Sequence, residues 1–197
     1  RQGVEVGIPN FANLFMTSPE INIDPTIAGS VVGTYWFLMM IGRLCGASIG
    51  AKVSSRAMLT VVSTVGIVLV LGAIFCADNI LVNMPVFKSD ISFGFAQVPV
   101  NVMLLILCGL CTSVMWGGIF NLAVEGLGKY TAAASGLFMV MVCGGGILPL
   151  IQGGVADFAG FLNSYWVIAL GLAYILFYAA IGSKNVNTDI PTDDYEA

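Results

Sequence analysis

The chain contains no histidine, and only 9% of its 197 residues are charged. Without histidine, a Ser-His-Asp triad, a Cys-His pair and the usual zinc sites are all excluded. An ordinary soluble domain carries about 25% charged residues, so this chain has too few to cover a surface in contact with water. These absences favour a membrane protein that is not an enzyme.

Several other functional signals are also missing. The chain has no basic patch that would indicate nucleic-acid binding, and no Gly-rich loop ending in Lys-Ser or Lys-Thr that would bind a nucleotide. Its five cysteines lie in apolar runs, where a thiol behaves as a small buried hydrophobe. The pair Cys108 and Cys111 has the spacing of a redox motif, but it lies inside an apolar segment without the soluble βαβ context. We therefore expect no disulfide framework, no metal and no cofactor.

Long apolar runs dominate the sequence, of which 58% is hydrophobic. Because a helix of about 20 apolar residues crosses a bilayer, the pattern predicts an all-α membrane domain over residues 1–184. The expected segments are 3–16, 26–51, 57–77, 99–124, 131–156 and 164–182. The first is too short to cross a bilayer alone and resembles the second half of a helix. Since the chain begins at Arg1 rather than methionine, we expect a cut through a longer protein.

Two further stretches lie outside these segments. Residues 78–98 form a longer connection whose apolar residues lie either on the membrane surface or as a packed cap, and the sequence does not decide between these. Residues 185–197 are predicted to be a polar, acidic cytoplasmic tail.

The charged residues predict the orientation, because Lys and Arg concentrate at cytoplasmic ends. Alternating the segments across the membrane places five basic residues on one side: Arg43, Lys52, Arg56, Lys129 and Lys184. The opposite side has only Lys88, together with Glu20, Asp24, Asp78, Asp90 and Asp157. Both ends of the chain are therefore expected in the cytoplasm.

A few polar and aromatic residues within the spans are candidates for function. An ionisable group inside a membrane usually marks a pathway or a proton relay, which makes Glu5 a candidate for proton coupling or substrate binding. The alternative is that Glu5 is solvated at the interface. Sugar hydroxyls need amide or carboxylate partners and sugar rings need aromatic faces. The candidate substrate-binding residues are Asn10, Asn13, Tyr35, Trp36, Trp116, Asn121 and Gln152. Interface anchoring for the aromatic residues and interhelical hydrogen bonds for the amides remain open.

The 24 glycines form two groups of interest. Gly42, Gly46 and Gly50 recur at four-residue spacing, which lets helices approach closely. In the fifth segment, Pro149 follows three consecutive glycines, Gly144, Gly145 and Gly146. This combination predicts a kink or break that suits a helix bending as a transporter changes its side of access.

Four sequence motifs together resemble a known family. They are Gly3-Val4-Glu5-Val6; Tyr35-Trp36 followed by Gly42-Arg43-Leu44; Ile119-Phe120 before Gly126-Leu127-Gly128-Lys129-Tyr130-Thr131; and Gly144-Gly145-Gly146-Ile147 with Pro149, Gln152-Gly153 and Ala156-Asp157. Over nearly the whole chain they resemble the C-terminal six-helix half of the fucose/glucose-galactose permease group, within the major facilitator superfamily.

The resemblance implies half of a twelve-helix sugar symporter of the cell inner membrane, with the first helix truncated. Such a protein moves a monosaccharide by alternating access, usually with a proton, and needs the missing N-terminal half. The resemblance also assigns gating at the cytoplasmic loop to Gly42, Arg43, Lys52 and Arg56, although this loop lacks the family's usual acidic residue. A symporter of another small polar solute, or a membrane sensor or scaffold that does not transport, are the alternatives.

Overall fold

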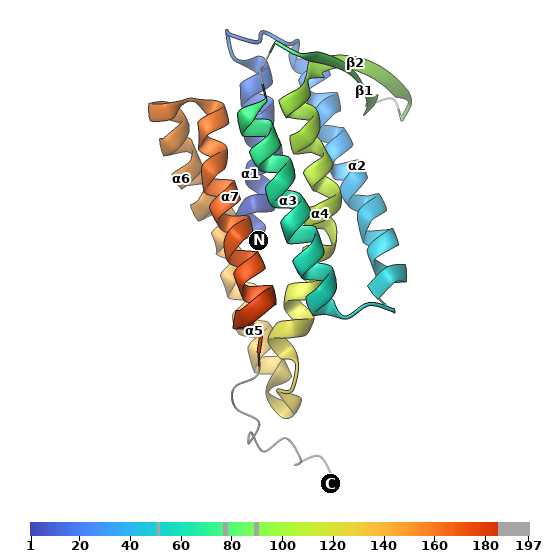
Figure 1. Ribbon diagram of the computed structural model, residues 1–197, viewed down its shortest axis with the longest axis vertical. Helices are drawn as coiled ribbons and strands as arrows, with labels where there is room; N and C mark the ends of the chain where they lie inside the picture. Colours follow the sequence, from blue (N-terminus) through green and yellow to red (C-terminus); the bar gives the residue numbers. More distant parts are fainter. Residues whose placement is uncertain (51, 77–78, 89–90, 185–197) are drawn as a thin grey trace.

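The computed structural model describes residues 1–50, 52–76, 79–88 and 91–184, which form a bundle of long helices with a short hairpin at one end (Figure 1). Its helices are α1 (Gln2–Thr17), α2 (Pro25–Gly50), α3 (Ser55–Phe75), α4 (Val100–Val124), α5 (Thr131–Val140), α6 (Gly144–Ala159) and α7 (Phe161–Phe177). Two strands, β1 (Leu81–Phe87) and β2 (Phe93–Pro99), lie between α3 and α4. The predicted tail, 185–197, lies outside the described residues.

Five helical stretches in the described part of the chain are long and apolar enough to cross a membrane. They are Pro25–Gly50, Ser55–Phe75, Val100–Val124, Gly128–Ala159 and Phe161–Gly182. They run along the long axis of the molecule, and their connections gather at its two ends (Figure 1). The chain is thus a multi-pass membrane protein.

Helix α1 differs from the others in length. At 16 residues and 1.5 Å per residue it is about 24 Å long, less than the roughly 30 Å of bilayer hydrocarbon. Its first residue lies about halfway along the bundle (Figure 1). Val4, Ile8, Phe11 and Phe15 repeat at helical spacing and are buried against the bundle.

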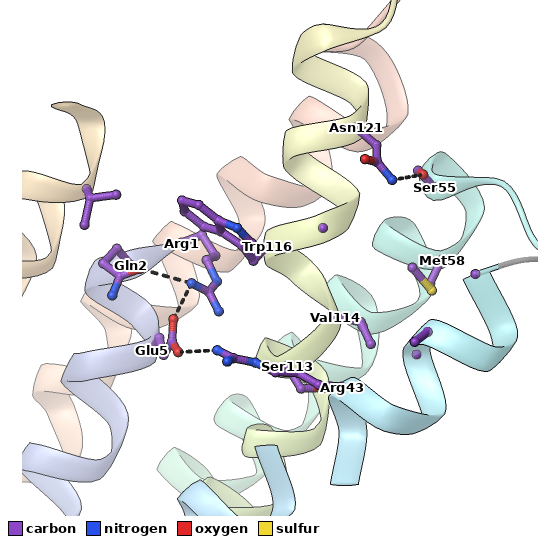
Figure 2. Close-up of a pocket in the computed structure, with 15 residues that line it drawn as sticks. Arg1, Gln2, Glu5, Arg43, Ser55, Met58, Ser113, Val114, Trp116 and Asn121 are labelled. Carbon is purple, nitrogen blue, oxygen red and sulfur yellow. Dashed lines mark hydrogen bonds and ion pairs between the residues drawn. The ribbon is translucent and has the colours of Figure 1, made fainter. Parts of the chain in front are cut away.

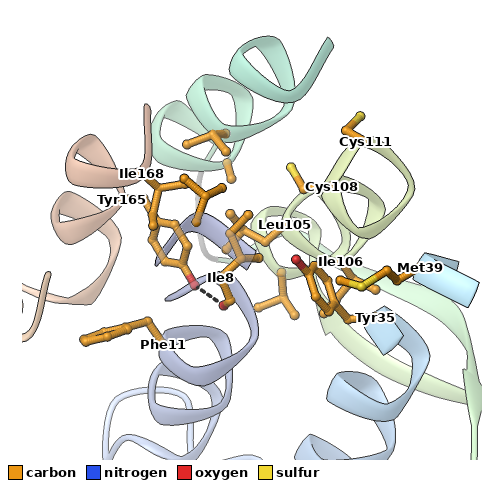
Figure 3. Close-up of a cluster of buried hydrophobic side chains, with 14 of the residues drawn as sticks. Ile8, Phe11, Tyr35, Met39, Leu105, Ile106, Cys108, Cys111, Tyr165 and Ile168 are labelled. Atoms are coloured by element: carbon orange, nitrogen blue, oxygen red, sulfur yellow. Dashed lines mark hydrogen bonds between the residues drawn. The ribbon is translucent and has the colours of Figure 1, made fainter. Parts of the chain in front are cut away.

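Packing at the centre depends on close helix approach and on buried tyrosines (Figure 3). The side chains of Tyr35 and Tyr165 are fully buried. The Tyr165 hydroxyl donates a hydrogen bond to the Ile8 carbonyl at 2.9 Å and so links α7 to α1. Gly42 lies against the Ser113 side chain of α4, where a methyl group would overlap it. The small-residue spacing in α2 therefore serves helix packing here.

The connection that the sequence left open forms an antiparallel β-hairpin. Leu81 pairs with Pro99 and Phe87 with Phe93. Alternate side chains, those of Met84, Val86, Ala96 and Val98, are buried. Because strand side chains alternate between two faces, the hairpin packs as a cap with its other face outward. The all-α expectation omitted this element because the alternating pattern is short and interrupted by Pro85.

The fifth hydrophobic segment divides into two helices. Helix α5 ends at Val140, a 3₁₀ turn covers Met141–Cys143, and α6 begins at Gly144. The irregular turn thus lies directly before the three glycines, and Pro149 lies inside α6. A role for this turn in gating stays a prediction.

Candidate functional site

A cavity of about 660 Å³ lies between the middle of the bundle and the end that carries the α2–α3 connection (Figure 2). The start of α1, the second halves of α2 and α4 and the start of α3 form most of its wall. Its lining residues are Arg1, Gln2, Glu5, Arg43, Gly46, Ala47, Gly50, Ser55, Met58, Ser113, Val114, Trp116, Gly117, Asn121 and Val142. The cavity thus joins residues that are more than 100 positions apart in the chain.

The Glu5 carboxylate lies at the inner end of this cavity, and the residue is only 4% exposed. Two guanidinium groups flank it (Figure 2). Arg1 forms an ion pair with one carboxylate oxygen, and Arg43 Nη2 lies 3.4 Å from the other. A buried carboxylate needs such partners, because an unpaired charge away from water costs several kcal/mol. The Arg43 side chain is 59% exposed, so the pair joins a buried acid to a base that has room to move.

The backbone at Glu5 is held by a second contact. Pro9 has no N–H, so the Glu5 carbonyl, four residues earlier, lacks its helical hydrogen-bond donor. The Tyr35 hydroxyl donates to this carbonyl at 3.2 Å and lies 3.1 Å from Thr112 Oγ1. One tyrosine therefore fastens α1 to α2 and α4 directly behind the Glu5 side chain.

Trp116 forms an aromatic wall of the cavity. The Arg1 guanidinium lies over its ring, 5.4 Å from the centroid, in a cation–π arrangement, and also donates to the Thr112 carbonyl at 3.3 Å. At the rim, Asn121 Nδ2 donates to Ser55 Oγ at 3.4 Å. The cavity thus offers an aromatic face, an amide, two guanidinium groups and a carboxylate, a set able to bind a polar, uncharged solute.

The structure places only part of the predicted site around this cavity. Of the proposed substrate and coupling residues, Glu5, Trp116 and Asn121 line it. Asn10 is exposed on α1 and Trp36 is 46% exposed on α2, and both lie outside the cavity lining. Asn13 is half-buried on α1, and Tyr35 lies behind the wall and acts through its hydroxyl. The substrate-binding role of these residues stays a prediction.

Gln152 lies away from the cavity, fully buried where α6 meets α1 and α7. Its Nε2 donates to Ser164 Oγ at 3.4 Å, and its Oε1 faces Gly7. This arrangement corresponds to the interhelical hydrogen bond that the sequence left open as an alternative to substrate binding.

The four predicted gating residues have separate surroundings. Arg43 reaches Glu5, while Gly42 packs against α4. Lys52 is exposed just after α2, and Arg56 donates to the Ser183 carbonyl at 3.2 Å, near the end of the last helical turn.

Sequence reasoning missed several residues that contribute to the site, among them Arg1, Ser55, Thr112 and Ser113. A hydroxyl inside an apolar run gives no signal of its own, because it can bond to its own helix backbone. The polar cavity and the buried ion pair within a membrane-spanning bundle define the class: a helical membrane protein with a polar cavity between its helices.

Comparison with known proteins extends this result. No protein-family model matches the chain. A crystal structure of a major facilitator superfamily transporter, FucP, in the outward conformation is similar, with a TM-score of 0.72 and 21% sequence identity. The match covers 93% of this chain and 41% of that one, which shows that the two share a fold.

Sequence relatives agree with the fold. A Brucella abortus (strain 2308) protein named glucose/galactose transporter is 29% identical over 184 residues, which are 93% of this chain. The L-fucose-proton symporter of Escherichia coli (strain K12) is 33% identical over 92 residues, 46% of this chain and 21% of that protein. The chain belongs to the major facilitator superfamily. It spans about 40% of the length of the Brucella relative.

Proposed function

We propose that this chain is the C-terminal membrane half, residues 1–184, of a secondary active transporter. The transporter moves a monosaccharide such as fucose, glucose or galactose across the inner membrane, coupled to a proton. The observation that carries the proposal is the buried Glu5 carboxylate at the inner end of an open cavity, paired with the largely exposed Arg43. The names of the related sugar transporters support the choice of substrate.

Coupling follows from the charges around Glu5. While Glu5 is ionised, it attracts both Arg1 and Arg43 and holds α2 against α1. Protonation of Glu5 removes the negative charge, and the two guanidinium groups then repel each other at short range. Arg43 is released into the cavity, where it donates to a sugar hydroxyl. Proton binding and sugar binding thereby favour the same rearrangement.

The sugar would bind between Trp116 and Asn121. An aromatic face covers the apolar side of a sugar ring, and an amide both donates to and accepts from its hydroxyls. Arg1 lies over the Trp116 ring in this structure, so the sugar competes with this cation for the ring. Such competition links substrate binding to the same ion-pair network.

The basic residues support a cytoplasmic position for one end of the bundle. Lys52, Arg56, Lys129 and Lys184 follow or precede helices at the end where the cavity lies. In this orientation the cavity faces the cytoplasm, as do both ends of the chain, and the polar tail extends into the cytoplasm.

The test is uptake of labelled fucose, glucose and galactose by cells that lack their own permeases and express the full-length gene, with and without a protonophore. Accumulation of one sugar that the protonophore abolishes would support proton-coupled symport. Absence of uptake for all three, with the protein confirmed in the membrane, would leave another polar solute or a non-transporting sensor.

A pair of variants tests the role of Glu5. Glu5→Gln should lose accumulation against a gradient but keep exchange of labelled for unlabelled sugar, because exchange needs no net proton movement. Glu20→Gln, which changes an exposed carboxylate in the α1–α2 connection, is the matched control and should keep both. Normal accumulation by Glu5→Gln would remove Glu5 from the coupling mechanism.

A further inference from the structure

The β-hairpin between α3 and α4 has an outer face that the described part of the bundle covers only in part, at Phe93, whose ring packs edge-to-face on Phe37 of α2 at 5.5 Å. Leu81, Ile91, Phe93 and Phe95 are 59%, 81%, 67% and 79% exposed. In water, such a concentration of exposed large apolar side chains on one short element would be unfavourable. Nothing in the transport mechanism above uses this face.

The hairpin tip lies along the side of α2 rather than beyond its end. The Phe87 backbone N–H donates to Thr34 Oγ1 at 2.9 Å, and the Phe37 ring stacks on Phe87 with centroids 4.9 Å apart. Thr34 is nine residues after Pro25, so at 1.5 Å per residue the tip lies about 13 Å below the start of α2. Figure 1 shows the hairpin at the end of the bundle that carries the first part of α2.

The contacted side of α2 points away from the cavity. At about 100° per residue, Phe37 lies about 120° and Thr34 about 180° around the helix from Arg43. Arg43 faces the cavity, so the hairpin covers the opposite flank of α2. The exposed hairpin face continues this flank of α2.

The length of α2 gives the depth of the tip. Its 26 residues span about 39 Å, about 9 Å more than the hydrocarbon thickness. If α2 leaves the hydrocarbon at its Gly50 end, its first six residues extend beyond the hydrocarbon at the other end. Thr34 then lies within about 5 Å of the boundary between acyl chains and headgroups.

The hydrogen bonds of the hairpin suit this interface. The Lys88 N–H donates to the Ser92 carbonyl at 2.9 Å, so the N–H groups of residues 85 and 87 on β1 point outward from the pair. Residue 85 is a proline without an N–H, and Phe87 donates to Thr34. Within the described part of β1, residues 85 and 87 near the tip therefore leave no free donor on this edge. On β2, the backbone N–H groups of Phe93 and Phe95 also point outward. They need hydrogen-bond acceptors from water or lipid headgroups, which the interface supplies.

Ile91 adds an independent observation. Its φ is 61°, in the left-handed region that β-branched residues rarely adopt and that Gly or Asn would occupy with less strain. At this exposed turn the chain therefore has a large apolar side chain in an unfavourable conformation.

We infer that the outer face of the hairpin, formed by Ile91, Phe93 and Phe95, is inserted into the acyl-headgroup boundary of the membrane beside α2. Its partner is lipid. The hairpin fixes the depth and rotation of α2, the helix that carries Arg43, relative to the bilayer.

Spin labels on the full-length protein in liposomes test this inference. Single cysteines replace Phe95 or Ile91 in a background without the native cysteines, and retained sugar uptake or, failing that, a monodisperse detergent-extracted protein shows that each variant folds. Val68→Cys, on an exposed position of the spanning helix α3, gives the lipid reference. Glu20→Cys gives the water reference at the same end of the bundle.

Labels at 91 and 95 should fall between the two references, with higher accessibility to oxygen and lower accessibility to a water-soluble nickel chelate than the Glu20 label. High accessibility to the nickel chelate, like that at Glu20, would show a water-exposed hairpin and overturn the inference. Immobilised labels with low accessibility to both reagents would show that protein covers this face, and would also overturn it. None of these outcomes depends on the transported solute.

Discussion

The hydrogen bond from Tyr35 to the Glu5 carbonyl leads to a prediction about two residues that do not touch through side chains. Pro9 leaves this carbonyl without a helical donor, and the Tyr35 hydroxyl replaces the donor at 3.2 Å. Tyr35→Phe should therefore destabilise the protein. Combined with Pro9→Ala, which restores a backbone N–H four residues after Glu5, the same change should cost little.

The magnitude follows from which groups lose a partner. After Tyr35→Phe, Thr112 keeps its own hydrogen bond to the Gly109 carbonyl at 3.2 Å, so only the Glu5 carbonyl becomes unsatisfied. A buried acceptor without a partner costs about 1–3 kcal/mol in soluble proteins, and hydrogen bonds between membrane helices average about 0.6 and reach about 1.7 kcal/mol. We expect about 1 kcal/mol for Tyr35→Phe alone and less than about 0.5 kcal/mol beside Pro9→Ala.

The assay is reversible unfolding of the full-length protein in detergent micelles for all four members of the cycle. Loss of the Pro9 ring changes the stability of both proteins that carry Pro9→Ala, with and without Tyr35→Phe, by the same amount. It therefore cancels when the costs of Tyr35→Phe in the two backgrounds are compared. Tyr165→Phe provides the control, because its hydroxyl donates to the Ile8 carbonyl, whose helical donor Ala12 has a normal N–H. Its cost should be the same with and without Pro9→Ala. An equal cost of Tyr35→Phe in both backgrounds would refute the reasoning and assign the hydroxyl to Thr112.

Two further predictions concern helix packing and capping. Gly42→Ala should destabilise the protein by about 1–3 kcal/mol, because the added methyl group overlaps the Ser113 side chain. Gly29→Ala, in the same helix but beside open space among the described residues, should not destabilise the protein in the same unfolding assay, because alanine favours a helix more than glycine does. The Asp24 carboxylate accepts a hydrogen bond from the Thr26 backbone N–H at 2.8 Å, which lowers its pKa. The ionised Asp24 therefore stabilises the folded protein fully at pH values above about 4, the pKa of an aspartate in the unfolded chain. This stabilisation is lost as the pH falls through the lower pKa of Asp24 in the folded protein. Asp24→Asn keeps a cap that does not titrate, so the difference in stability between variant and wild type should change only at acid pH.

Some of the site could be predicted from local sequence, and some could not. Glu5 was predictable because a carboxylate in an apolar segment is costly wherever the helix lies. Trp116 and Asn121 were predictable as residue types suited to a sugar. Their grouping around one cavity depends on the packing of α1 against α4, which no short-range pattern specifies.

Tyr35 also has contacts that its residue type and local sequence could not predict. Its residue type predicted an aromatic face for the substrate, which stays a prediction, whereas its burial and its hydrogen bond to the orphaned Glu5 carbonyl could not be predicted from residue type. The hairpin was missed because alternation over seven residues is a weak signal beside five runs of membrane length.

Through its motifs the sequence resembles the major facilitator superfamily, and through its apolar runs it determined by itself that this is a helical membrane protein. The physical reason is that the length and hydrophobicity of each span are local properties, set by the thickness of the bilayer. Only the tertiary structure decided which groups neutralise Glu5, where Tyr35 donates, and that the connection after α3 folds back along α2. Apart from the local pair of Arg1 and Glu5, these contacts join residues 30 to 53 positions apart, and such contacts arise only when the helices pack.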